Sequence, residues 1–190
     1  MNAVQEATTP QPVAITVDQF RLLDENGAFD QFSKTELIEG VIYAMQGQHR
    51  PHARAKTRLA VRLHQRLEQI NSPLEPLVEA SVDMGRLNAP EPDIALTSDP
   101  QGQGYVPLSS LALAIEVSDS SAAFDLSKKA LLYAQQGIAE YWVVDLPAKV
   151  IHQLSQPSEH GYGDRIVVPL GEAITSVTID GLTVSTEGLV

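Results

Sequence analysis

Apolar side chains recur every four residues between residues 51 and 70. The stripe is made of Ala55, Leu59, Leu63 and Leu67. On a helix with 3.6 residues per turn, this spacing collects the apolar groups on one side, which predicts an amphipathic helix packed against the rest of the fold. Two further helices are predicted over 16–24 and 125–136, the second ending where Gly137 breaks the pattern.

Short apolar runs separated by Gly, Pro and Asn predict β-strands in the rest of the chain. The expected strands span 36–38, 41–45, 77–84, 92–96, 111–117 and 141–145. The run 111–117 is apolar on both faces and predicts a central strand, and strand, helix and strand over 111–145 form a βαβ unit with parallel strands. The tail, 149–190, is expected to add antiparallel strands. The predicted fold is therefore α/β or α+β, with a mixed central sheet flanked by helices.

Length and composition limit the classes of protein to consider. The chain has 190 residues, 43% of them apolar, and no cysteine. These values fit one domain over 15–190, preceded by a flexible tail over 1–14 that has neither a basic nor an apolar segment typical of a secretory signal. No apolar run is long enough to cross a membrane. A cytoplasmic protein without disulfides or thiolate metal sites is expected.

Positive charge is concentrated on the long predicted helix although the chain is acidic. The net charge is −11, yet six of the 13 basic residues lie between residues 50 and 66, a window without any acid. A row one turn apart is formed by Arg54, Arg58, Arg62 and Arg66. Like charges at this spacing repel one another, so the row needs compensation, either from elsewhere in the chain or from nucleic-acid phosphates.

Two carboxylates and an amine stand out as candidate chemistry. Asp93 opens one predicted strand, and Glu116 closes the next. If the two strands pair antiparallel, Asp93 lies beside Glu116, and two adjacent carboxylates favour a bound cation. Hard oxygen ligands suit Mg²⁺ or Mn²⁺. Lys129 follows Asp125 by four residues on the next helix and so faces the sheet with it, whereas Lys128 points about 100° away. Acids at strand ends are also common as solvated or capping residues, and both lysines could be helix surface.

Several motifs occur in an order that resembles a known family. They are Glu-Leu-Ile-Glu-Gly (36–40), His52, Pro-Asp (92–93), Ala-Ile-Glu-Val-Ser (114–118), Asp125, Lys129 and Tyr133 at four-residue spacing, and the run 137–145. Together they resemble the Uma-two family of restriction endonucleases, which belongs to the PD-(D/E)xK nuclease superfamily. The resemblance covers roughly residues 16–145, with a weaker echo in the tail.

The resemblance implies a restriction-endonuclease-like core and a site. It makes Asp93 and Glu116 the metal ligands of a Mg²⁺- or Mn²⁺-dependent endonuclease. The superfamily's usual lysine, two residues after the glutamate, is Ser118 here, and the matching amine is Lys129. Glu36 is expected to assist at the site. His52 is expected either to contact a phosphate or a site carboxylate, or only to cap the long helix.

The resemblance also implies the partners and the reaction. DNA is the expected substrate, bound in part by Arg54, Arg58 and Arg62, and cleavage would leave a 5′-phosphate. A double-strand cutter needs two sites, which favours a homodimer. A nuclease-fold protein that binds nucleic acid without turnover is the main alternative, consistent with the negative net charge. A different hydrolase is disfavoured, because the serines at 118–121 are not in a Gly-x-Ser-x-Gly turn and no glycine-rich phosphate loop is present.

Overall fold

The computed structural model describes residues 12–190, and most of the predicted tail over 1–14 lies outside this range. The helices are α1 (Val17–Glu25), α2 (Arg50–Gln69), α3 (Ala122–Phe124) and α4 (Ala130–Gln135), with a 3-10 turn at Leu108–Ser110 and a π-helical turn, Asp125–Lys129, between α3 and α4. The strands are β1 (Lys34–Ile38), β2 (Val41–Met45), β3 (Glu75–Val78), β4 (Val82–Asp83), β5 (Ile94–Thr97), β6 (Val106–Pro107), β7 (Leu111–Ser118), β8 (Glu140–Asp145), β9 (Val150–Ser158), β10 (Gly161–Pro169), β11 (Ala173–Thr175) and β12 (Thr183–Ser185).

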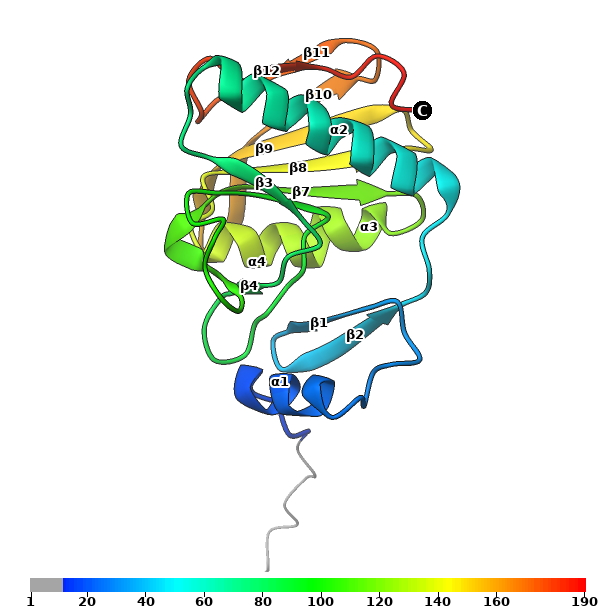
Figure 1. Cartoon of the computed structure of the whole chain (residues 1–190), viewed down its shortest axis with the longest axis vertical. Helices are drawn as coiled ribbons and strands as arrows, with labels where there is room; N and C mark the ends of the chain where they lie inside the picture. The colour runs from blue at the N-terminus through cyan, green and yellow to red at the C-terminus, as the bar shows by residue number, and fades with distance from the viewer. Residues whose placement is uncertain (1–11) are drawn as a thin grey trace, which may run out of the picture.

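A mixed sheet of six strands forms the centre of the fold, in the order β10-β9-β8-β7-β5-β3 (Figure 1). Only β7 and β8 run parallel, and the other neighbours are antiparallel. The helical segment 122–135 connects the two parallel strands, which confirms the predicted βαβ unit. The tail adds β9 and β10 at one edge and the small β11–β12 pair, confirming the extra antiparallel strands.

Each face of the sheet is covered by a different helix because the buried side chains alternate along the strands. The α2 stripe packs on one face against Ile94, Ile115, Val117, Trp142 and Val144. The helix α4 packs on the other face against Ala95, Ala114, Tyr141 and Val143. Residues of β11, β12 and the C-terminal end join the first cluster, so this part of the tail closes over the α2 side of the sheet (Figure 1).

The hairpin β1–β2 lies apart from the large sheet, beside α1 (Figure 1). Its turn places Glu39 at φ 52° and Gly40 at φ 74°, the two left-handed residues of a type I′ turn. A Cβ at position 40 would lie 2.5 Å from the Cβ of Ala14, so glycine is required there. The hairpin fixes the position of Glu36, which is fully buried on β1.

Three of the predicted boundaries that differ from the structure bear on the cavity. The expected strand 77–84 is divided into β3 and β4, because Glu79 takes a left-handed conformation (φ 53°) and turns the chain. The strand expected at 92–96 begins at Ile94, which leaves Asp93 just before β5. The helix expected over 125–136 begins at Ala122 and contains the π-helical turn, a feature often found at functional sites.

Candidate active site

Antiparallel pairing of β5 and β7 brings the two predicted carboxylates together. Ile94 is opposite Ile115, which places Asp93 beside the end of β7. The backbone N–H of Val117, the residue after Glu116, donates a 2.8 Å hydrogen bond to Asp93 Oδ2. Both carboxylates line a cavity of about 610 Å³. The adjacency expected from strand pairing is therefore present.

Asp93 is surrounded by two lysines and a histidine from two other elements. His52 Nε2, on the first turn of α2, lies 3.2 Å from Asp93 Oδ2, and Lys34 and Lys56 place their Nζ atoms 3.6 and 3.8 Å from Oδ1. Burial alone would favour the neutral carboxyl group. The hydrogen bonds from His52 and Val117, with the charge of Lys34, outweigh burial and hold the pKa of Asp93 well below its usual 3.8. Asp93 is thus ionised at neutral pH.

Lys129 lies at the centre of a buried cluster of acids. Its Nζ is 2.9 Å from Glu116 Oε1, 2.9 Å from Glu36 Oε2 and 3.9 Å from Asp125 Oδ1. Burial favours a neutral amine, but the charges of these three acids outweigh it and raise the pKa of Lys129 above its usual range. The side chain is 1% exposed. The i, i+4 spacing singled out the lysine that lies in the cavity, whereas Lys128 pairs with Glu39 at the surface.

Glu116 is harder to ionise than Asp93. Burial raises its pKa to about 8, although Lys129 and Lys34 act in the opposite direction. Tyr133 donates a 3.2 Å hydrogen bond to the same oxygen that Lys129 contacts, so both groups fix the carboxylate on its strand. Burial therefore favours the protonated form of Glu116 more than that of Asp93, and a cation bound beside it would favour loss of the proton.

The remaining polar groups of the cavity hold these side chains in place. Ser118 and Ser121 donate hydrogen bonds of 2.7 and 2.6 Å to Asp125 Oδ2. The serines therefore support the acid next to Lys129, and of the two only Ser121 lines the cavity. Glu79 lies 2.5 Å from Lys56 Nζ, and although burial opposes it, this contact lowers the pKa of Glu79.

The donor set fits a hard divalent cation that keeps water or substrate ligands. Asp93 Oδ1 and Glu116 Oε2 accept no hydrogen bond from the described residues, although Lys34 and Lys56 lie 3.6 and 3.8 Å from Asp93 Oδ1. Within residues 12–190, no group of three or more His, Cys, Asp or Glu side chains is arranged as a ligand set. Two carboxylates with the other positions left to water and phosphate is an arrangement that Mg²⁺ commonly adopts.

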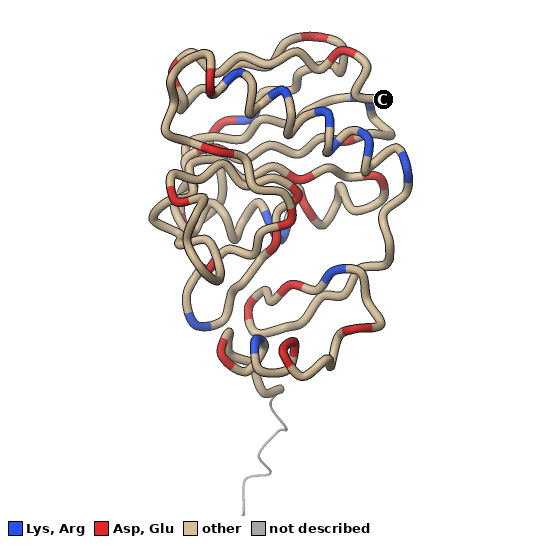
Figure 2. Tube along the Cα trace, viewed as in Figure 1, with Lys and Arg blue, Asp and Glu red and all other residues tan. Residues whose placement is uncertain are grey.

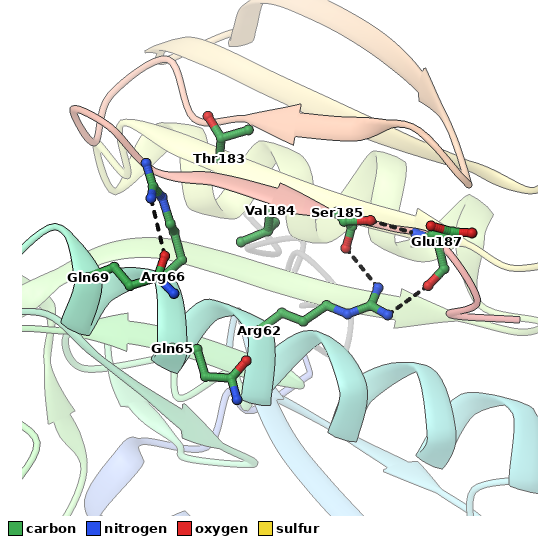
Figure 3. A pocket seen from close by; sticks show the side chains of 8 residues that line it. All are labelled: Arg62, Gln65, Arg66, Gln69, Thr183, Val184, Ser185 and Glu187. Atoms are coloured by element: carbon green, nitrogen blue, oxygen red, sulfur yellow. Dashed lines mark hydrogen bonds between the residues drawn. The ribbon is translucent and has the colours of Figure 1, made fainter.

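The predicted arginine row lies away from the cavity for most of its length. Figure 2 shows basic residues recurring along α2. Arg62 donates to the carbonyls of Ser185 and Glu187 at 2.8 and 2.7 Å (Figure 3). Arg66 donates to the carbonyl of Gly181 at 2.8 and 3.0 Å. Arg58 contacts the carbonyl of Gly188. These neutral carbonyls accept hydrogen bonds from the guanidinium groups but leave the positive charge of the arginines in place.

Two lysines that contact Asp93 were not predicted from the sequence. Lys56 follows His52 by one helical turn and borders the apolar stripe, so its burial is marked by that spacing. Lys34 precedes Glu36 by two residues on β1, and the alternation of a strand puts both on one face. Each signal exists in the sequence but becomes meaningful only once Asp93 is known to lie opposite.

The fold and the paired carboxylates beside buried lysines are those of a nuclease-like protein. The sequence matches the family model described as Uma2, "Putative restriction endonuclease", over residues 17–187. The chain therefore belongs to the Uma2 family, which confirms the resemblance and supports a nuclease. No curated protein matches the chain.

A solved structure shows the same fold. The crystal structure of "a putative nuclease belonging to DUF820" from Anabaena variabilis ATCC 29413 superimposes with a TM-score of 0.71. It is 18% identical in sequence, and the match covers 92% of this chain and 97% of the other. Separately, no helix in the described part of the chain has the length and apolar character needed to cross a membrane.

Proposed function

We propose that the protein is a Mg²⁺- or Mn²⁺-dependent endonuclease that hydrolyses phosphodiester bonds in DNA. The observation that carries this proposal is the convergence of Asp93, Glu116 and buried lysines in one cavity, together with membership of the Uma2 family. Asp93 and Glu116 would hold the cation. When bound, the metal would lower the pKa of an attacking water and polarise the phosphate.

The side chains of the site divide the remaining work. Lys129 fixes Glu116 through its 2.9 Å contact and contributes positive potential to the cavity. His52 orients Asp93 through its 3.2 Å contact, and Glu36 holds Lys129 from the other side. The water oxygen forms a bond to phosphorus while the bond to the 3′-oxygen breaks, giving a 5′-phosphate and a 3′-hydroxyl.

DNA binding would use the exposed end of α2. Arg54 makes no hydrogen bond or ion pair with the described residues, while Arg58 and Arg62 retain positive charge beside neutral carbonyls. These charges would contact phosphates outside the cavity. Cutting both strands would require two sites, so we propose a homodimer that acts on DNA in the cytoplasm. Light scattering coupled to size-exclusion chromatography would measure the mass of the assembly.

Cleavage assays with matched variants test the proposal. Plasmid and single-stranded DNA are incubated with Mg²⁺ or Mn²⁺ and the native chain, Asp93→Ala, Glu116→Ala or Lys129→Ala. Lys128→Ala serves as the control, because Lys128 pairs only with Glu39 at the surface. Cleavage should be lost in the three site variants and kept in the control. Cleavage that survives all three substitutions refutes the site.

A second candidate function is DNA binding without turnover. It is favoured by Glu116, because burial raises its pKa and so disfavours the ionised form that would bind a metal. Tight DNA binding by the native chain, with no cleavage in either metal at about pH 7 or about pH 9, would support this alternative.

A further inference from the structure

The three lysines around the carboxylates differ in how fully they are bonded. Lys129 has two carboxylate oxygens at 2.9 Å. Lys56 donates to Gln48 Oε1 at 2.6 Å and to Glu79 Oε1 at 2.5 Å. Lys34 donates no hydrogen bond to any described residue, and its nearest carboxylate oxygen, Asp93 Oδ1, is 3.6 Å away. An ammonium has three N–H donors, so Lys34 is the cation of this group with the most donors left for a ligand.

Lys34 is also placed where a substrate would enter. Its side chain lines the catalytic cavity and is 7% exposed. The ammonium faces the oxygen of Asp93 that accepts no hydrogen bond from the described residues. Lys34 thus partly neutralises Asp93 Oδ1, the oxygen that a bound cation would also use.

Neutralising the carboxylates would release this ammonium. Once Asp93 and Glu116 are balanced by another cation, Lys34 loses its electrostatic attraction to Asp93 and is repelled by the new charge. A buried ammonium without a partner is costly. An anionic phosphate in the cavity would supply the missing acceptors within reach of the same side chain.

We propose that Lys34 supplies the ammonium that contacts the reacting phosphate, while Lys129 positions Glu116. The inference rests on the proposed endonuclease function and assigns a residue to it. Lys34 would stabilise the negative charge that grows on the non-bridging phosphate oxygens. The step needs no proton from Lys34, because the charge alone is used.

The competing explanation is that Lys34 only holds Asp93 in place. The two roles predict opposite effects on metal binding. If Lys34 merely orients Asp93, its removal leaves this metal ligand poorly ordered and lowers the affinity for the metal. If it competes with the cation for Asp93 and then turns to the phosphate, its removal tightens metal binding while cleavage is lost.

The experiment measures both quantities on the full chain. Lys34→Met, Lys34→Gln and Lys34→Arg are compared with Lys128→Met, a matched change outside the cavity. Mn²⁺ affinity is measured without DNA by electron paramagnetic resonance, and single-turnover cleavage is measured at saturating DNA and metal. We expect the single-turnover rate constant to fall by about 10²-fold or more in the Met and Gln variants, and to stay within about tenfold of the native value in Lys34→Arg. Mn²⁺ should bind several-fold more tightly to the Met and Gln variants.

The outcomes separate this inference from the proposed function. A native chain that cleaves no nucleic acid in either metal refutes both. A native chain that cleaves, with Lys34→Met and Lys34→Gln cleaving like the control, refutes the role of Lys34 alone. Loss of cleavage together with weaker Mn²⁺ binding in both variants also refutes it, in favour of the orienting role. If Lys34→Met does not fold, Lys34→Gln carries the comparison, and failure of both to fold assigns Lys34 to the structure and refutes the inference.

Discussion

Replacing Glu116 by Gln should stabilise the metal-free protein at alkaline pH while removing a metal ligand. Glu116 is fully buried, and its pKa is about 8 in the folded chain against a usual 4.5. Gln keeps an oxygen that can accept the hydrogen bonds from Lys129 and Tyr133. It cannot ionise, so it removes the burial of a negative charge above about pH 8.

The sign and size of the effect follow from the two pKa values. Between pH 4.5 and about 8, the folded chain keeps a proton on Glu116 that the unfolded chain has lost. Stability contributed by this group therefore falls as the pH rises through that window. The whole window corresponds to at most about 5 kcal/mol, and the part between about pH 6 and about pH 9 to roughly 3 kcal/mol. The Gln variant should lack this loss.

Urea unfolding in the presence of a chelator measures the difference. Trp142 is the single tryptophan and is fully buried, so its fluorescence reports unfolding. The free energies of unfolding of the native chain and Glu116→Gln should diverge with rising pH, with Gln the more stable at about pH 9. Glu75→Gln, at an exposed position of β3, controls for loss of one carboxyl group. Parallel pH profiles for native and Glu116→Gln would refute the reasoning.

Three further predictions follow from the same contacts. Lys129→Met should destabilise the fold by about 3–5 kcal/mol, because it leaves buried acids without their cation, whereas Lys128→Met should cost under about 1 kcal/mol. Urea titration compares the free energies of unfolding of the two variants. Equal losses of stability would contradict the buried network. Asp93→Asn should lower cleavage by about 10³-fold and flatten the acid side of the stability profile, since a lowered pKa adds stability that is lost as the pH falls below about 4. Arg54→Gln should weaken DNA binding and reduce its salt dependence without changing stability, while Arg62→Gln should lower the free energy of unfolding by about 1–2 kcal/mol, because two carbonyls lose their donor. Fluorescence anisotropy at several salt concentrations measures DNA binding, and thermal unfolding measures stability. An unchanged salt slope in Arg54→Gln would exclude a contact between Arg54 and DNA.

The parts of the site that were predictable depend on local periodicity. The i, i+4 spacing of Asp125 and Lys129 on a helix, and the order of two short strands, were enough to place Lys129 and to pair Asp93 with Glu116. The π-helical turn kept this relation, since Asp125 and Lys129 are both buried and 3.9 Å apart. Periodic signals of this kind survive because one residue's position fixes the next.

The parts that were not predictable depend on contacts between distant segments. Lys34 approaches Asp93 from the β1–β2 hairpin, and Glu79 approaches Lys56 from the turn after β3. No local sequence pattern sets the orientation of this hairpin or this turn. The left-handed Glu79 that divides the expected strand is such a case, since glutamate has no preference for positive φ. Likewise, the acceptors for Arg62 are backbone carbonyls more than 100 residues later, and a carbonyl carries no side-chain signal.

The site keeps three cations and several acids buried together, and this balance has a physical consequence. Lys129 contacts both Glu36 and Glu116 and keeps its proton, so the group whose charge changes most easily is the Glu116 carboxyl group. Asp93 is already ionised and attracts a cation, while Glu116 resists ionisation until one is bound. Metal binding should therefore release a proton and become tighter as the pH approaches about 8.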